Sequence, residues 1–221
     1  MGQGSYVLCE WCSIQEAFPQ FEEAVRKLDQ KVLAKCSSEW APKTPGYIKT
    51  SSGQYGRTTI LPALFDDHAS LPMNATRSLL VGGATWRQLF TAAGHQQLLA
   101  GVGASNTIPE DIKIALMGFA FPNKEQHITE IKMQLGDQKL GRFNLEQMLL
   151  YKKPALVFAD GYILDEEQGF ELYGNVKGPI PIHNNNDAYA GLWQYIIPIG
   201  AAYYKTVDRV LGQCGAAITT T

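Results

Sequence analysis

Charge is scarce in this chain, and neither sign dominates. Charged residues make up 18% of the 221 residues and the formal net charge is −2, whereas a typical globular protein carries about 25%. Without a basic excess the chain has little means of neutralising a phosphate backbone, so general nucleic-acid binding is not expected. A low charge beside 45% hydrophobic residues favours a protein that buries surface against partners.

Long apolar runs are also missing. No run approaches the roughly 20 residues that span a bilayer, so no membrane span is expected. The start of the chain lacks the basic and apolar parts of a secretory signal. Tyr6 stands where the N-myristoylation pattern needs Ser or Thr. We therefore expect synthesis in the cytoplasm, with a virion or another assembled particle as a destination.

Cysteine and histidine are few and widely spaced. Cys9 and Cys12 form a CxxC pair, and Cys36 and Cys214 would complete four zinc ligands. A second close pair is missing and no βαβ pattern suits a redox pair, so ordinary thiols are expected. The histidines are His68, His95, His127 and His183. None is at the three- or four-residue spacing of a helical metal pair, and the sequence predicts no metal and no cofactor.

The remaining candidate sites are weak. Asp66 and His68 belong to the only close acid–histidine group, the first place to look for catalysis, but no nucleophile motif accompanies them. Residues 82–85 (Gly-Gly-Ala-Thr) precede an expected helix and lack the lysine of a phosphate-binding loop. Asp165 and Glu167 are expected to be solvated residues of a hairpin. No catalytic residue is predicted.

The first 105 residues are expected to hold an N-terminal helix, an extended arm and a short helix. Apolar residues at three- and four-residue intervals predict a helix that begins at Pro19 and ends at Cys36. Proline, glycine and serine interrupt the segment 37–73, which predicts a long arm crossing a surface.

The short helix is predicted from a capping pattern. Thr85 and Gln88 fit a capping box, so a helix is expected to continue to about Ala93. Gly94 would end it in a left-handed conformation.

Residues 106–221 are expected to form a β core. Strands are predicted at 112–121, 127–135, 138–143, 155–159, 161–165, 170–177, 180–183 and 192–200. Hairpin turns are predicted at 136–137 and 166–169, and Asn144 is expected to cap a short helix ending near Tyr151. The pattern predicts a mainly β (α+β) fold: an antiparallel two-sheet β-sandwich, with the jelly roll as one form.

No catalytic pattern accompanies this scaffold, which favours a protein that is not an enzyme. The leading hypothesis is a structural, self-assembling subunit, such as a virion capsid, tail or filament component. Its partners would be copies of itself and other structural proteins. Two alternatives stay open: a soluble β-sandwich module that binds a carbohydrate or another ligand, and an enzyme of unrecognised type.

Overall fold

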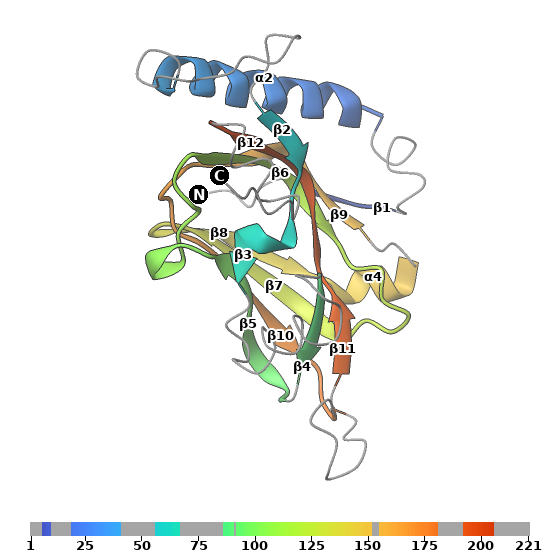
Figure 1. The fold of residues 1–221 in the computed structure, drawn as a ribbon. Coiled ribbons are helices and arrows are strands. Elements are labelled where there is room, and N and C mark those ends of the chain that lie inside the picture. The colour runs from blue at the N-terminus through green and yellow to red at the C-terminus, as the bar shows by residue number, and fades with distance from the viewer. Residues whose placement is uncertain are drawn as a thin grey trace, which may run out of the picture.

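The computed structural model describes residues 6–9, 19–40, 56–66, 86–90, 92–151, 155–180 and 192–205. These residues are mostly β, in antiparallel sheets, with one long N-terminal helix (Figure 1). The predicted mainly β, antiparallel class is therefore confirmed. Most of the predicted arm, at 41–55 and 67–73, lies outside the described residues. No described helix combines the length and the apolar character needed to cross a bilayer.

Two five-stranded sheets account for most of the strands. The first has the order β1 (Tyr6–Cys9), β9 (Ala155–Leu164), β6 (Ile112–Ala120), β12 (Ile197–Tyr204) and β2 (Gly56–Thr59). The second has the order β3 (Phe65–Asp66), β5 (Gly94–Gly101), β10 (Phe170–Val176), β7 (Ile128–Leu135) and β8 (Gln138–Asn144). A two-stranded sheet joins β11 (Leu192–Tyr195) to β4 (Arg87–Phe90). The helices among the described residues are α2 (Phe21–Glu39) and α4 (Glu146–Tyr151), with 3-10 turns η2 (Pro62–Leu64) and η3 (Ala104–Asn106).

Eight of these strands pair in a nested pattern. The outermost pair is β2 with β12, followed inward by β5 with β10, β6 with β9, and β7 with β8. Two further pairs, β12 with β6 and β10 with β7, join the nested pairs into sheets. Strands from the first 105 residues thus complete sheets whose other members follow residue 106.

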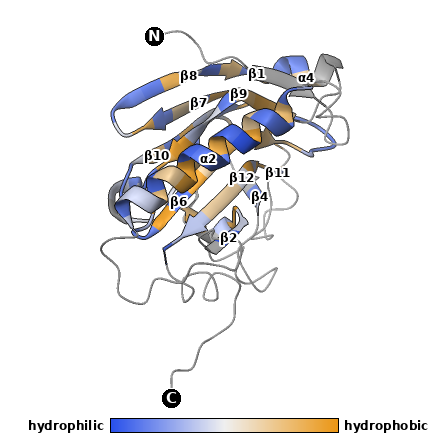
Figure 2. Ribbon diagram, turned by 90° about the horizontal axis from the view of Figure 1, so that it is seen from above, coloured by the Kyte–Doolittle hydropathy of each residue, from blue (hydrophilic) through white to orange (hydrophobic). Residues whose placement is uncertain are grey.

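One apolar cluster takes side chains from both five-stranded sheets. Ile114 and Leu116 of β6 belong to it, as do Ile131 of β7 and Leu172 of β10. The opposite face of β6 packs under α2. Figure 2 shows α2 lying over the first sheet, with both hydrophilic and hydrophobic residues along the helix. All nine residues of β6 are buried, which explains the nearly continuous apolar sequence of this strand.

Several predicted elements are confirmed closely. The strands predicted at 112–121, 127–135, 138–143 and 170–177 correspond to β6, β7, β8 and β10. The capped helix is α4, where the backbone N–H of Glu146 donates to Asn144 Oδ1 at 2.8 Å. The helix predicted from Pro19 is α2, which ends at Glu39 rather than Cys36. Period-two and period-3.6 apolar patterns are local, so they place such elements well.

Two strand boundaries were wrong. The strands predicted at 155–159 and 161–165 form the single strand β9. The strand predicted at 192–200 is two strands, β11 and β12, which belong to different sheets. Ile196 separates them and is fully buried. Residues 181–183 of the strand predicted at 180–183 lie outside the described residues.

The helix predicted from Thr85 to Ala93 was also wrong. Residues 87–90 form β4, which pairs with β11, and Gly94 begins β5. Gln88 is fully buried, and its Nε2 donates to the carbonyl of Leu98 at 2.7 Å instead of capping a helix. A capping pattern is a local signal, and strand pairing with a segment more than 100 residues away outweighs it.

The turn at 166–169 does not make the predicted hairpin. β9 lies in the first sheet and β10 in the second, so this turn passes the chain between sheets. Its backbone bonds instead to the segment before β6, where the N–H of Ile108 donates to Gln168 O and the N–H of Glu167 donates to Ile108 O. Adjacent strands predict a hairpin only when they share a sheet.

Candidate functional site

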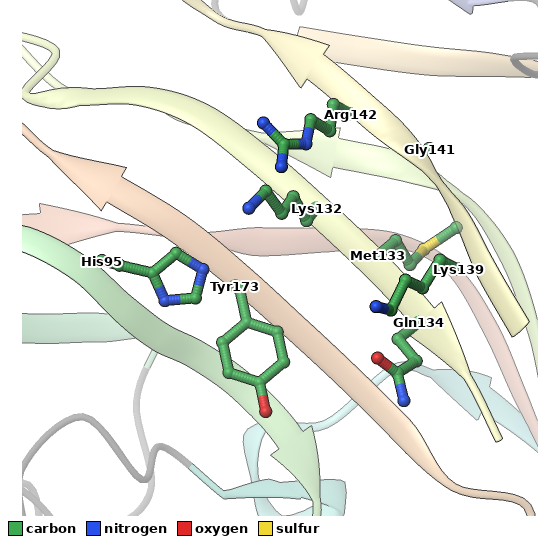
Figure 3. A pocket seen from close by; sticks show the side chains of 8 residues that line it. All are labelled: His95, Lys132, Met133, Gln134, Lys139, Gly141, Arg142 and Tyr173. Carbon is green, nitrogen blue, oxygen red and sulfur yellow. The ribbon is translucent and has the colours of Figure 1, made fainter. Parts of the chain in front are cut away.

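A pocket of about 380 Å³ lies on the outward face of the second sheet (Figure 3). Side chains alternate between the faces of a strand, and a register shift between β7 and β8 lets Lys139 and Arg142, three residues apart on β8, line the same pocket. His95 comes from β5, Tyr173 from β10, Lys132 and Gln134 from β7, and Lys139 and Arg142 from β8, with Met133 and Gly141 completing the lining.

Strand register brings the central residues of this pocket into one row. Tyr173 lies opposite Lys132, and Lys132 lies opposite Arg142 on the next strand. Figure 3 shows the Lys132 and Arg142 side chains extending from neighbouring strands into the same region, beside the rings of His95 and Tyr173. The row therefore combines an aromatic surface with two adjacent cations.

The aromatic part of the pocket is held by hydrogen bonds. The rings of His95 and Tyr173 stack with centroids 5.2 Å apart and planes 23° apart. The Tyr173 hydroxyl donates to Glu171 Oε1 at 3.1 Å, and the same oxygen accepts from Gln97 at 3.2 Å and from Asn106 at 2.5 Å. Burial and the Glu171 carboxylate raise the pKa of Tyr173. The hydroxyl thus keeps its proton and the ring its orientation.

The pocket has a clear excess of positive charge. Its lining includes Lys132, Lys139 and Arg142, and none of the lining residues that the structure describes carries a carboxylate. Arg142 Nη1 lies 3.6 Å from Glu130 Oε1, with the two side chains 66% and 35% exposed, and such exposed pairs are weak. Within the described part of the chain, neither lysine pairs with a carboxylate. Two like charges directly opposite each other on neighbouring strands are destabilising.

An adjoining cavity of about 320 Å³ differs in charge. It shares His95 and Lys132 with the pocket, but its lining also includes the carboxylates of Glu130 and Glu146. The other lining residues are Thr129, Asn144 and Asn175. The positive region is therefore short and ends at an acidic neighbour.

A second polar cluster lies where the end of α2 meets β6. Lys113 is 1% exposed, and its Nζ lies 2.7 Å from Glu39, 3.0 Å from Asp165 and 3.8 Å from Glu166. Trp40 Nε1 donates to Glu166 at 3.1 Å, and Lys113 Nζ lies 5.3 Å from the centre of the Trp40 ring.

These contacts shift the pKa values within the cluster. Burial alone would lower the pKa of Lys113, but hydrogen bonds to Glu39 and Asp165 outweigh it and the pKa is raised. Burial would raise the pKa of Asp165, but Lys35 and Lys113 outweigh it and the pKa is lowered. Lys113 and Asp165 therefore both favour their charged forms. The cluster therefore attaches α2 to the sheet and is not a free binding site, and the expectation that Asp165 is a solvated hairpin residue was wrong.

The residues singled out in the sequence are not brought together in the described structure. Cys36 is fully buried, and burial raises the pKa of its thiol to about 12. Cys9 lies in the edge strand β1, and Asp66 ends β3. The other members of the proposed sites, Cys12, His68, residues 82–85 and Cys214, lie outside the described residues. Within the described ranges, no three His, Cys, Asp or Glu residues group closely enough to hold a metal ion.

Sequence reasoning missed the pocket entirely. Lys132, Arg142 and Tyr173 come from three strands, and their proximity depends on a register that a single sequence does not display. The outward positions of predicted strands were the only available signal. A list of charged and aromatic residues at those positions would have contained all three.

Comparisons with known proteins do not assign this chain to a family. No family model, no curated protein and no solved structure matches the chain. Its function is therefore inferred from the pocket and the strand pairing.

Proposed function

We propose that this chain is a structural subunit that assembles with copies of itself, built on a jelly-roll β-sandwich. The observation that carries the proposal is the nested pairing of eight strands. These eight strands are counted in chain order, from β2 as strand one to β12 as strand eight. Strand one pairs with strand eight, two with seven, three with six, and four with five. Strand eight also pairs with strand three, and strand seven with strand four. This pairing is the one expected of a jelly roll built from two Greek keys, and it supports that part of the proposal.

The shared apolar cluster supports packing of the two sheets face to face. Phe119 and Phe158 of the first sheet lie 6.1 Å apart between ring centres, and Phe143 of the second sheet lies 5.4 Å from Phe158. Aromatic contacts of this kind across two sheets are typical of a sandwich core.

Assembly is favoured by the composition and by the sheet edges. Jelly rolls serve as capsid subunits and as lectin domains, and the low charge of this chain suits a protein that buries surface between copies. Both edges of the first sheet, β1 and β2, are four-residue strands. Such short edges already limit uncontrolled pairing, and in the proposed assembly neighbouring copies would cover what remains of them. The step from jelly roll to virion subunit rests on this analogy of fold.

Light scattering after size-exclusion chromatography tests the proposal. The full chain has a mass of 24.4 kDa, and we expect particles many times heavier that grow with protein concentration. Contacts based on apolar burial weaken on cooling, so the particles should shrink in the cold and recover on warming. A monomer at every concentration and temperature, with native circular dichroism, would overturn the proposal.

A second candidate function is ligand binding by the outward face of the second sheet. The observation that favours it is the cationic pocket that lies beside the stacked rings of His95 and Tyr173. This candidate does not exclude assembly, because the pocket belongs to one sheet of one subunit. Neither proposal includes a catalytic step.

A further inference from the structure

We propose that the pocket on the second sheet binds an anionic saccharide, with a carboxylate or sulfate group held by Lys132 and Arg142. The inference is independent of assembly, since every residue that it uses belongs to one chain. The size of the pocket agrees with such a ligand. A volume of about 380 Å³ falls at the small end of the range for small-molecule sites, about 300–1,000 Å³.

The anionic group is indicated by the opposed cations. Lys132 and Arg142 are register partners on the same outward face, and the described chain offers them one carboxylate, Glu130, 3.6 Å from Arg142. Lys139 lines the same pocket. An anion between these side chains would remove their mutual repulsion and accept charge-assisted hydrogen bonds, which the guanidinium forms in a forked geometry.

The saccharide ring is indicated by the aromatic and amide groups. Tyr173 is half-buried and stacked on His95, and its bond to Glu171 fixes the ring. A fixed aromatic side chain offers an apolar surface for the C–H groups of a sugar, at little cost in conformational entropy. Gln134 Nε2 donates to the carbonyl of Gly136 at 2.9 Å, which orients its amide oxygen as an acceptor for a sugar hydroxyl.

A nucleic acid fits the surroundings less well. A phosphate backbone needs a continuous basic track, but the cavity next to this pocket is lined by Glu130 and Glu146. The whole chain also carries a net charge of −2. The positive region is short and is bordered on one side by the carboxylates of this neighbouring cavity.

Isothermal titration calorimetry on the full chain tests the inference with four probes. N-acetylglucosamine 6-sulfate and glucuronic acid supply the two anionic groups on a sugar ring, glucose lacks the charge, and sodium sulfate lacks the ring. We expect both anionic sugars to bind more tightly than glucose and sodium sulfate, and their affinities to fall as salt rises. If sodium sulfate bound as tightly as the sulfated sugar, the proposal that the site recognises a saccharide would be refuted. If glucose bound as tightly as the anionic sugars, the proposed role of the cations would be refuted.

Three variants separate the two parts of the site. Arg142→Gln and Lys132→Gln should each weaken the anionic sugars by roughly tenfold. Tyr173→Ala should weaken the sugars but leave any weak binding of sodium sulfate unchanged. Lys27→Gln is the control, because Lys27 lies on α2, on the other sheet, with its side chain 62% exposed. Unchanged affinity in the first two variants, or no binding of either anionic sugar at millimolar concentration, would refute the proposal.

A decamer of uridylate provides a further arm. Tighter binding of this RNA than of the anionic sugars, lost in Arg142→Gln, would assign the site to single-stranded nucleic acid instead. The test of saccharide binding can fail independently of the test of assembly. If the chain forms particles that do not bind the sugars, only the saccharide proposal is refuted. If the chain is a monomer that binds them, only the assembly proposal is refuted.

Discussion

At the scale of single residues, Lys113 shows how a buried charge is tolerated. Its ammonium group has carboxylates from α2 and from the turn after β9 within 4 Å, and it also faces the Trp40 ring. The cost of burying a charge is offset only by such paired and hydrogen-bonded partners. The sequence shows a lysine between two isoleucines of an apolar strand and gives no hint of these partners.

We predict that Lys113→Met lowers the free energy of unfolding by about 2 kcal/mol. This is less than the loss of about 3–5 kcal/mol for a fully enclosed pair, because the three carboxylates are partly exposed. Urea denaturation measures the change. Lys27→Met is the control, since its pair with Glu23 is exposed, and it should leave the midpoint in place. Equal midpoints for both variants would contradict the role of Lys113.

Gly200 is a second residue whose identity is fixed by its neighbours. Its φ is +154°, and a Cβ atom built there would lie 1.9 Å from the carbonyl oxygen of Ala115 on β6. The pairing of β12 with β6 shifts at this point. A side chain would force the two strands apart where α2 also packs on them.

We predict that Gly200→Ala destabilises the fold by about 3 kcal/mol, because it adds both a backbone clash and an unfavourable conformation. Gly136→Ala is the matched control. Gly136 has φ +53° but open space around it, so only the conformational cost of about 1 kcal/mol applies. Thermal unfolding of both variants should rank them in this order, and the reverse order would show that the close approach of β6 and β12 is wrong.

At the scale of elements, α2 is attached by both apolar and charged contacts. Leu28, Val32 and Cys36 pack on β6 and β12, and the Lys113 cluster fixes the end of the helix. The period-3.6 pattern predicted the helix and its buried face. It did not predict which sheet the helix covers, since that depends on strands more than 70 residues away in the sequence.

The attachment of α2 should weaken in acid. The folded pKa of Asp165 is lowered, so its contribution to stability is complete above the ordinary Asp value, about 3.9, and is lost as the pH falls through the folded pKa. Lys113 has a raised pKa in the folded chain, so its contribution to stability is lost only as the pH rises through that pKa. Urea titrations of the native chain and Asp165→Asn should therefore differ at pH 7 and converge below pH 4. A constant difference across this range would contradict the ion pairs.

At the scale of the whole molecule, the nested pairing is the central feature. The outermost pair joins residues 56–59 to residues 201–204, and only β7 and β8, among the four nested pairs, are neighbours in sequence. Most of the structure is therefore built from contacts between distant segments. The same arrangement places the pocket on one sheet and α2 on the other.

Such a topology predicts slow folding. Closing a long loop costs conformational entropy before the contacts between distant strands form. Proteins dominated by such contacts therefore fold in about milliseconds to seconds. Stopped-flow refolding followed by tryptophan fluorescence should show its main phase in this range, with Trp40 and Trp193 reporting on α2 and β11. A main phase in microseconds would contradict the nested pairing.

The sequence by itself determined the β class, the positions of β6, β7, β8 and β10, the helix α2 and the capped helix α4. These depend on side-chain periodicity and turn chemistry within a few residues. Tertiary structure decided what those strands meet: β4 in place of a helix, a turn between sheets in place of a hairpin, and the convergence of Lys132, Arg142 and Tyr173. The physical reason is register, because a shift of one residue moves every side chain of a strand to the opposite face, and register is set by partners far along the chain.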